Sequence, residues 1–372
     1  MNSMSAPLSL IIFTDVHYLA ENLYDEGEAF QKIIDTNVGK YTEGSQVIMR
    51  EMTEAVIREK PDAVLICGDL TFNGEKESLI EFSGYLKEMK DEGIPVFVIC
   101  GNHDIEHRHT ACYRGDKVLP AEKTSAEDFM KIMGPYGYDA AFARDTSSCS
   151  YAAVLRDDIW LLCLDANVPS ARGFLAPDTM AFAEDVLKRA ETEGRTVITM
   201  THQNVLKQNE LMYHGFVLNN HDEVETLLKK YGVSVNFSGH THLQHISRSE
   251  GLTDICCQCL TLWPLSYLNV RLELPECTFA FEKKILPVLQ AESRQRFDET
   301  VVRMIAPQLE GRKIPERDRE EMLQLAAEVI VPYFSGLESD REKYRNSSGW
   351  KLWHRYAMDA FWFFYLKQIL EP

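Results

Sequence analysis

Short apolar runs of strand length recur through the first three quarters of the chain, and each ends in a polar cluster. They are Leu8–Phe13, Ala63–Cys67, Pro95–Cys100, Ile159–Leu164, Val197–Met200 and Val233–Phe237. The runs lack a polar face, and several are rich in Val and Ile. This pattern predicts strands that are buried on both sides of their sheet.

Helix-like stretches lie between several of these runs. They are Gln46–Lys60, Ser78–Glu92, Thr179–Glu193 and Asp222–Tyr231. Gly93 and Gly194 stand where a helix would end before the next strand begins, a position that favours glycine. Alternating strands and helices indicate an α/β core whose sheets are covered by helices.

Two longer segments interrupt this alternation, Tyr18–Ser45 after the first predicted strand and Ile105–Asp145 after the third. Long excursions from the carboxyl ends of strands are where α/β proteins usually build substrate contacts. We therefore expect these two segments to shape the substrate site.

The pattern of charged and apolar residues changes after about residue 283. Lys283–Ser335 and Asp340–Leu370 have charged, amphipathic patterns that predict helices, and they carry no chemical motif. We therefore expect a catalytic domain over residues 1–283 and a C-terminal helical subdomain over residues 284–372. The subdomain would pack on the core or cover the site.

Composition and charge narrow the function classes. The chain has 372 residues, of which 45% are hydrophobic and 26% charged, as in an ordinary globular protein. Its formal net charge of -18 argues against a surface that binds nucleic acid non-specifically. The same charge would repel phosphate esters, so a phosphate site would need local positive charge, which bound metal ions can supply.

Cysteine usage and the terminal segments bear on the compartment. The nine cysteines have no disulfide-framework spacing, and their odd number favours a reducing environment. Leu8–Phe13 is too short for a signal peptide, and Ala360–Leu370 is too short to span a bilayer. We expect a cytoplasmic protein that does not enter a membrane; its oligomeric state is not predicted.

Side chains that can bind metal ions follow five of the six predicted strands. The five blocks are Asp15-Val16-His17, Gly68-Asp69, Gly101-Asn102-His103-Asp104, His202 and Gly239-His240-Thr241-His242. If the strands run parallel, these side chains gather at one edge of the sheet. Any one block could be turn chemistry or a polar residue satisfied locally, but five at strand ends are hard to explain in that way.

Each block also has a local rationale. In Asp-x-His and His-x-His, alternate residues of an extended segment point the same way and can reach one centre. Glycine precedes three of the candidate ligands, where the backbone must turn sharply or approach closely. Oxygen and imidazole donors together suit Mn, Fe, Zn or Co rather than Ca or Mg alone.

These blocks resemble those of the calcineurin-like metallophosphoesterases, a superfamily that includes purple acid phosphatases and class III cyclic-nucleotide phosphodiesterases. The resemblance spans roughly residues 8–245, and Gly68-Asp69-Leu70-Thr71 with Gly74-Glu75 is most similar to the bacterial phosphodiesterase-like branch. It implies a four-layer α/β/β/α sandwich and two divalent or trivalent metal ions, with Mn and Fe favoured. The substrate would be a small phosphate ester.

The resemblance also implies a ligand set. The first ion would be held by Asp15, His17, Asp69 and His242, and Asp69 would bridge to a second ion held also by Asn102, His202 and His240. His202 lies in the loosest motif, because Thr201 precedes it where many relatives have Gly or His. His214 is its only nearby competitor and lies in a loop-like stretch.

A pair of metal ions would activate a bridging hydroxide to attack phosphorus. His103 would protonate the leaving oxygen, and Asp104 could orient its imidazole. His107, Arg108 and Tyr18 are candidate substrate contacts. We expect a phosphodiesterase or phosphomonoesterase, with the diesterase favoured. The alternatives are a phosphoprotein or nucleotide monoesterase and a non-catalytic binding scaffold.

Overall fold

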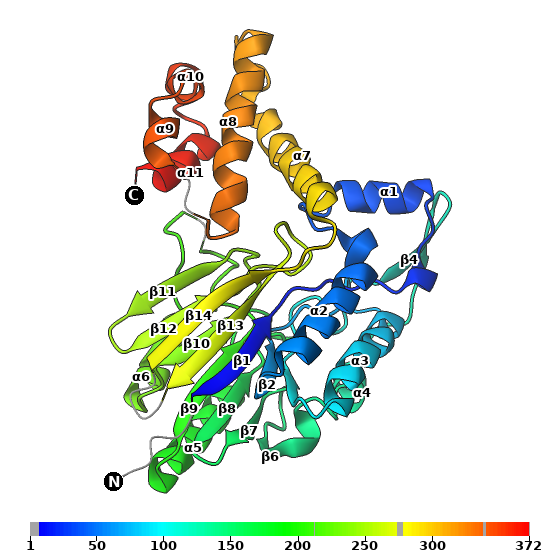
Figure 1. Ribbon diagram of the computed structural model, residues 1–372, viewed down its shortest axis with the longest axis vertical. Helices are drawn as coiled ribbons and strands as arrows, with labels where there is room; N and C mark the ends of the chain where they lie inside the picture. Colours follow the sequence, from blue (N-terminus) through cyan, green and yellow to red (C-terminus); the bar gives the residue numbers. More distant parts are fainter. Residues whose placement is uncertain (1–6, 212, 274–277, 338–339, 372) are drawn as a thin grey trace.

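Two sheets form the centre of the protein (Figure 1), whose computed structural model describes residues 7–211, 213–273, 278–337 and 340–371. The first sheet has the order β14 (Thr278–Ile285), β13 (Ser266–Glu273), β1 (Leu8–Phe13), β2 (Ala63–Ile66), β3 (Val96–Val98). The second has the order β11 (His245–Ser249), β12 (Leu252–Cys256), β10 (Val235–Ser238), β9 (Thr196–Thr201), β8 (Ile159–Leu164), β7 (Tyr151–Arg156), β6 (Ala141–Arg144).

Parallel strands occupy the middle of both sheets. In the first, β1, β2 and β3 run parallel, and Leu10 pairs with Ala63. In the second, β8, β9, β10 and β12 run parallel, and Cys163 pairs with Met200. Antiparallel strands flank these centres. Within each sheet, the parallel strands therefore end at a common edge.

Helices cover the outer face of each sheet. They are α2 (Ser45–Glu59) and α3 (Lys76–Asp91) on the first sheet, and α5 (Pro177–Glu193) and α6 (His221–Lys230) on the second. Along β8, Leu161 and Cys163 join the core between the sheets, whereas Trp160 and Leu162 pack with the α5 and α6 side. This alternation of two buried faces confirms the predicted four-layer α/β/β/α sandwich.

The two long excursions have regular structure of their own. Residues 18–45 contain α1 (Glu28–Asp35), and residues 105–145 contain the hairpin β4 (Ala111–Arg114) and β5 (Lys117–Pro120), then α4 (Ala126–Ile132) and β6. α1 and the hairpin lie beside each other, since the Ala29 amide donates to Gly115 O. Both are placed to form walls around the strand ends.

The C-terminal part is helical, as the pattern predicts. Its helices are α7 (Gln290–Leu309), α8 (Glu316–Phe334), α9 (Arg341–Arg345), α10 (Ser348–Tyr356) and α11 (Phe361–Leu370). The predicted helical stretch begins too early, because Lys283 to Ile285 belong to β14. The helices bury one hydrophobic cluster with Cys259 and Leu262 of the preceding loop. In the part of the chain that the structure describes, no helix is long and apolar enough to cross a membrane.

Candidate metal centre

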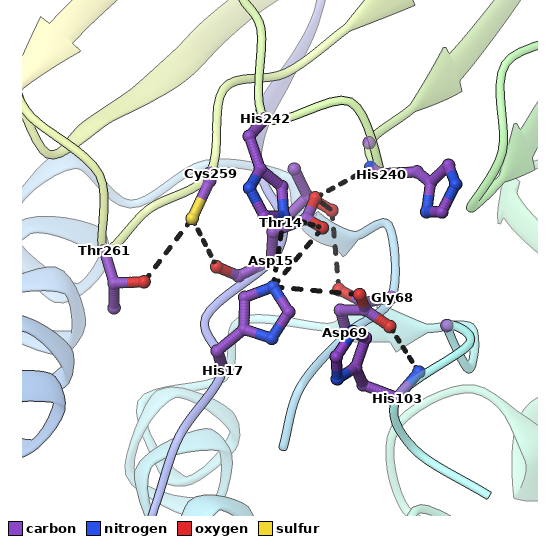
Figure 2. A network of polar contacts seen from close by, with 12 residues as sticks. Thr14, Asp15, His17, Gly68, Asp69, His103, His240, His242, Cys259 and Thr261 are labelled. Atoms are coloured by element: carbon purple, nitrogen blue, oxygen red, sulfur yellow. Dashed lines mark hydrogen bonds and ion pairs between the residues drawn. The ribbon is translucent and has the colours of Figure 1, made fainter. Parts of the chain in front are cut away.

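Candidate ligands from both sheets meet at the carboxyl ends of the parallel strands. Asp15 and His17 follow β1, Asp69 follows β2, Asn102 follows β3, His202 follows β9, and His240 and His242 follow β10. Figure 2 shows Asp15, His17, Asp69 and His242 directed toward one another. The predicted gathering therefore occurs between the edges of two facing sheets and not at the edge of one.

Four donor atoms converge in the first half of this cluster. His17 Nε2 lies 3.8 Å from Asp15 Oδ1, 3.7 Å from Asp69 Oδ2 and 3.2 Å from His242 Nε2. His242 Nε2 is in turn 3.4 Å from Asp15 Oδ1. Two donors that bind one cation at about 2.1 Å are separated by about 3.0 Å in octahedral and about 3.4 Å in tetrahedral geometry. The four atoms can thus surround a single metal ion.

A second group of donors shares Asp69. Its Oδ2 lies 3.3 Å from His202 Nε2, which lies 3.1 Å from Asn102 Oδ1. Donor atoms of Asp69, His202 and His240 all fall within 4.8 Å of one another. Asp69 Oδ2 therefore stands between two sets of donors, where it can bridge two ions. The structure brings His202 into this cluster, whereas His214 packs against Tyr213.

Hydrogen bonds fix which atom each ligand presents. His202 Nδ1 lies 2.8 Å from Cys67 O and His240 Nε2 lies 2.7 Å from Gly215 O, so each of these nitrogens is a donor. The opposite ring nitrogen of each is left for a metal ion. Thr14 Oγ1 donates to Asp15 Oδ2 at 2.7 Å, while Asp15 Oδ1 is buried without a hydrogen-bond partner among the described residues. A cation would satisfy that oxygen, so the donor set fits a metal.

The pKa values of the clustered residues also favour a bound cation. Burial alone would raise the pKa of Asp69, but the neighbouring charges of His202 and His103 hold that pKa well below its usual value. Burial disfavours charged His202, yet Asp69 and Asp15 raise the pKa of His202 to about 9. The pocket therefore favours positive charge next to Asp69, which a metal ion can provide in place of the proton.

Five candidate ligands have a left-handed backbone. The φ angles are 53° at Asp15, 47° at His17, 51° at Asp69, 69° at His240 and 59° at His242. This differs from the extended segments expected for Asp-x-His and His-x-His. A non-glycine residue in this region costs roughly 1–2 kcal/mol. The chain thus holds strained turns at the site, which aim paired side chains inward after each strand has ended.

Glycines next to the ligands permit close approach, as expected. A Cβ at Gly101 would lie 2.1 Å from Asp69 Oδ1 and 2.3 Å from Asp69 N. A Cβ at Gly239 would lie 2.5 Å from Asp15 Oδ2. Neither position can accept a side chain unless a ligand moves.

Replacement of Gly101 by Ala is expected to displace Asp69 and to reduce bound metal, measured by elemental analysis. The matched control is Gly84→Ala in α3, where an added Cβ meets no atom of the described residues within 4 Å. This control should keep its metal and gain about 0.5–1 kcal/mol of stability, because alanine favours helices. Full metal occupancy in the Gly101 variant would contradict the steric account.

His103 lies beside the cluster and is oriented by backbone and amide groups. Its Nδ1 is 2.8 Å from Phe72 O and 3.1 Å from Asn73 Oδ1. The imidazole of His103 packs edge-on against that of His17, with centroids 4.8 Å apart. The Nε2 side of His103 is therefore left for the cavity that the residue lines.

Asp104 does not have the orienting role that the sequence suggests. Its Oδ1 accepts hydrogen bonds from the amide and hydroxyl of Thr71, both at 2.9 Å, and its Oδ2 accepts one from the Gly101 amide at 2.7 Å. Asp104 is adjacent to His103 in sequence but directed to the other side of the turn. It holds the loops that carry His103, and Phe72 with Asn73 orient the ring.

The three predicted substrate contacts have different positions. His107 and Arg108 line the cavity, and the His107 ring stacks on that of His103 with centroids 4.7 Å apart. Tyr18 is fully buried and packs against Phe82 and Tyr85. The prediction for Tyr18 is corrected, because the chain continues along Thr71 after His17 and directs Tyr18 into the core.

Sequence reasoning missed three residues at the site. Lys40 is 5% exposed and lines the cavity together with Asp69. Burial lowers the Lys40 pKa, against the opposing effect of the negative charges of Asp69 and Asp15. Asn73 contacts His103, and Arg172 donates to Asn102 O at 2.9 Å and Ile105 O at 2.7 Å. No local pattern marks these residues, since each reaches the site through the fold.

Cys259 lies beside the first group of candidate ligands. Its sulfur groups with His17 and His242, and its thiol donates to Asp15 O at 3.1 Å. Burial raises its pKa to about 12. It is therefore a protonated thiol that supports the Asp15 backbone.

The chain is similar to known proteins in sequence and in fold. A family model described as calcineurin-like phosphoesterase matches residues 8–244. A dimetal phosphatase from Danio rerio aligns with a TM-score of 0.53 and 14% identity, over 76% of this chain and 97% of the other. A purple acid phosphatase from yellow lupin (Lupinus luteus) seeds aligns with a TM-score of 0.46 and 12% identity, over 76% of this chain and 52% of the other. No curated protein sequence matches significantly.

Proposed function

The chain belongs to the calcineurin-like phosphoesterase family, and on this premise we propose that it hydrolyses phosphate esters at a centre of two metal ions. The observation that carries the proposal is the position of Asp69 Oδ2, 3.7 Å from His17 Nε2 and 3.3 Å from His202 Nε2. One carboxylate oxygen between two groups of donors suits a pair of neighbouring cations.

The ligand set inferred from the sequence is kept in this proposal. Asp15, His17, Asp69 and His242 would hold one ion, and Asp69, Asn102, His202 and His240 the other. Manganese or iron fits their mixed nitrogen and oxygen donors. When bound, the ions would polarise phosphoryl oxygens and make a water-derived nucleophile available near neutral pH.

His103 would protonate the leaving oxygen. With Nδ1 donating to Phe72 O, the ring keeps one orientation, and Nε2 can carry a proton into the cavity. Asp104 would act as a positioning residue, because it pins the Gly101 amide and Thr71 around the turn that carries His103. Both roles require that the 101–104 turn stays rigid.

A phosphodiester substrate is favoured over a monoester by the size of the cavity. The cavity that begins at Asp69 and His103 has a volume of about 1010 Å³, at the upper end of common ligand pockets. A diester carries a second substituent on phosphorus, and this cavity leaves room for it. A phosphoprotein or nucleotide monoesterase is the alternative.

Turnover of two chromogenic substrates separates these possibilities. The metal-free protein is reloaded with Mn, Fe, Zn or Co in turn and assayed on bis-p-nitrophenyl phosphate and on p-nitrophenyl phosphate. Faster turnover of the diester supports the phosphodiesterase, and faster turnover of the monoester supports the alternative. If no metal gives turnover of either substrate, the protein is a binding scaffold and the proposed activity is wrong.

Lys40 is expected to bind the phosphate. Replacement by Met should lower kcat/KM by roughly ten- to hundredfold, the effect of losing one hydrogen bond between charged groups, while bound metal is unchanged. The control is Lys32→Met, since the Lys32 side chain is 72% exposed on α1. Steady-state kinetics with parallel metal analysis measure the effect. Unaltered kinetics for the Lys40 variant would exclude a phosphate contact.

A further inference from the structure

The cavity at the metal centre extends far beyond the space that a phosphoryl group needs. One end is formed by Asp69, Asn102, His103, His240 and His242. Among the described residues that line it, Asp69 is the only carboxylate, whereas Lys40 and Arg108 contribute positive charge. In a chain of net charge -18 this end is adapted to an anion. The rest of the cavity must accommodate the group that is attached to this anion.

Aliphatic and aromatic side chains from distant parts of the sequence also line this cavity. They come from the α1 region, the β4–β5 hairpin and the C-terminal helices, and they are Ile33, Val38, Val118, Leu119, Met304 and Phe334. The α1 region and α7 are in contact, because Arg296 bonds to Ile34 O and to Glu43. Figure 1 shows α1 beside the lower end of α7.

Three polar side chains that line the cavity beside these apolar residues have partners within the protein. Thr36 Oγ1 donates to Ile33 O at 3.0 Å. Asn37 donates to Thr42, and Thr110 Oγ1 donates to Asn73 O at 2.6 Å. A ligand group that needs hydrogen bonds, such as a nucleobase edge or a peptide backbone, would lose its water here and compete with these bonds.

Several of the apolar wall residues are held open to solvent. Val118 is 59% exposed, Val38 48%, Met304 44% and Leu119 40%. Their position around one cavity distinguishes them from singly scattered apolar residues, which need no explanation. Such an arrangement is stabilised when an apolar group covers it.

We propose that the substrate is an amphiphilic phosphate ester, whose phosphate binds at the metal centre and whose extended aliphatic chain enters the cavity between α1, the β4–β5 hairpin and the C-terminal helices. This inference rests on the proposed function for the position of the phosphate. It gives residues 18–45, residues 105–145 and the C-terminal helices a common role, since all three line the cavity for the aliphatic chain of the substrate.

Binding of n-alkyl phosphonates tests the proposal without requiring turnover. Methyl, butyl, hexyl and octyl phosphonate, all kept monomeric, are titrated into the metal-loaded full-length protein by calorimetry. The affinity should rise by roughly two- to fourfold for each added methylene until the wall is covered. A constant affinity along the series would overturn the proposal. So would binding seen only when the phosphonate is presented in vesicles.

One double variant and a matched control locate the alkyl chain of the ligand. Val118→Asn with Met304→Gln should flatten the dependence on chain length and leave methyl phosphonate binding unchanged. Val154→Asn is the control, because Val154 is also an exposed strand valine, at 47%, and lies on β7 away from the cavity. If the affinity of the double variant still rises with alkyl chain length, the alkyl chain binds elsewhere and the proposal is overturned.

Turnover of p-nitrophenyl n-alkyl phosphates separates this inference from the proposed function. Hydrolysis that accelerates with chain length supports both. Hydrolysis at a rate independent of chain length supports the phosphoesterase and overturns the amphiphilic substrate. If no ester is hydrolysed while phosphonates still bind with chain-length dependence, the proposed activity fails and the binding site stands.

Discussion

Replacement of Asp69 by Asn is expected to remove at least one metal ion per chain and to lower turnover by roughly a thousandfold or more. Asp69 Oδ1 accepts the His103 amide at 2.8 Å, and an asparagine oxygen can keep that bond. Its amide nitrogen would then take the place of Oδ2 between the two groups of donors, where a nitrogen of this kind cannot bind a cation. Elemental analysis and steady-state kinetics measure the two losses.

The control for this prediction is Asp178→Asn in the first turn of α5, which is remote from the site. Circular dichroism of the Asp69 variant should match that of the unaltered protein, because the buried hydrogen bond is retained. If the Asp69 variant keeps two ions with ordinary turnover, Asp69 is not the bridge.

Replacement of His103 by Asn should retain both ions and still lower turnover by roughly a hundred- to ten-thousandfold, the usual range for loss of a general acid. The asparagine amide can donate to Phe72 O in place of Nδ1, so the turn should survive. It has no group that can give a proton at Nε2. The loss should be largest for substrates with poor leaving groups.

An alkyl phosphodiester and a p-nitrophenyl ester, assayed side by side, show this difference. The p-nitrophenolate leaves without a proton, so its release should suffer least. His221→Ala, on α6, is the matched control. Equal losses on both esters would indicate that His103 only positions neighbouring groups, and unchanged turnover of the alkyl ester would remove it from the chemistry.

The sequence predicts the central strands and helices well for a physical reason. Strands buried on both faces are continuous apolar runs, and Leu8–Phe13 and Ile159–Leu164 are observed with the predicted bounds. The candidate ligands follow from the same pattern, because they lie in the polar clusters that come directly after such strands. Their pairing across two sheets is a property of the folded chain and is not visible along it.

Residues that reach the site by tertiary packing were beyond prediction. Lys40 lies on a turn after α1, and only the packing of α1 against the hairpin and α7 brings it to Asp69. Asp104 is a case in which adjacency in sequence is misleading. It is next to His103, which suggests a shared role, but a tight turn directs its carboxylate to Thr71 instead. Sequence neighbours in such turns point in different directions.

The C-terminal helices illustrate a third limit. Their amphipathic pattern predicts helices, and Trp353 is buried within their own cluster. The pattern does not reveal that Met304 and Phe334 also line the cavity at the metal centre. One apolar surface can serve packing at one position and a ligand at the next. The boundary between residues 283 and 284 stays a prediction.

The most direct test is a metal titration of the metal-free, full-length protein, followed at once by calorimetry and by hydrolysis of bis-p-nitrophenyl phosphate and p-nitrophenyl phosphate. We predict binding that saturates at two ions per chain, with turnover of at least one ester that reaches its plateau only as the second ion binds. Saturation at one ion or none, or turnover that does not depend on added metal, would contradict the dinuclear centre.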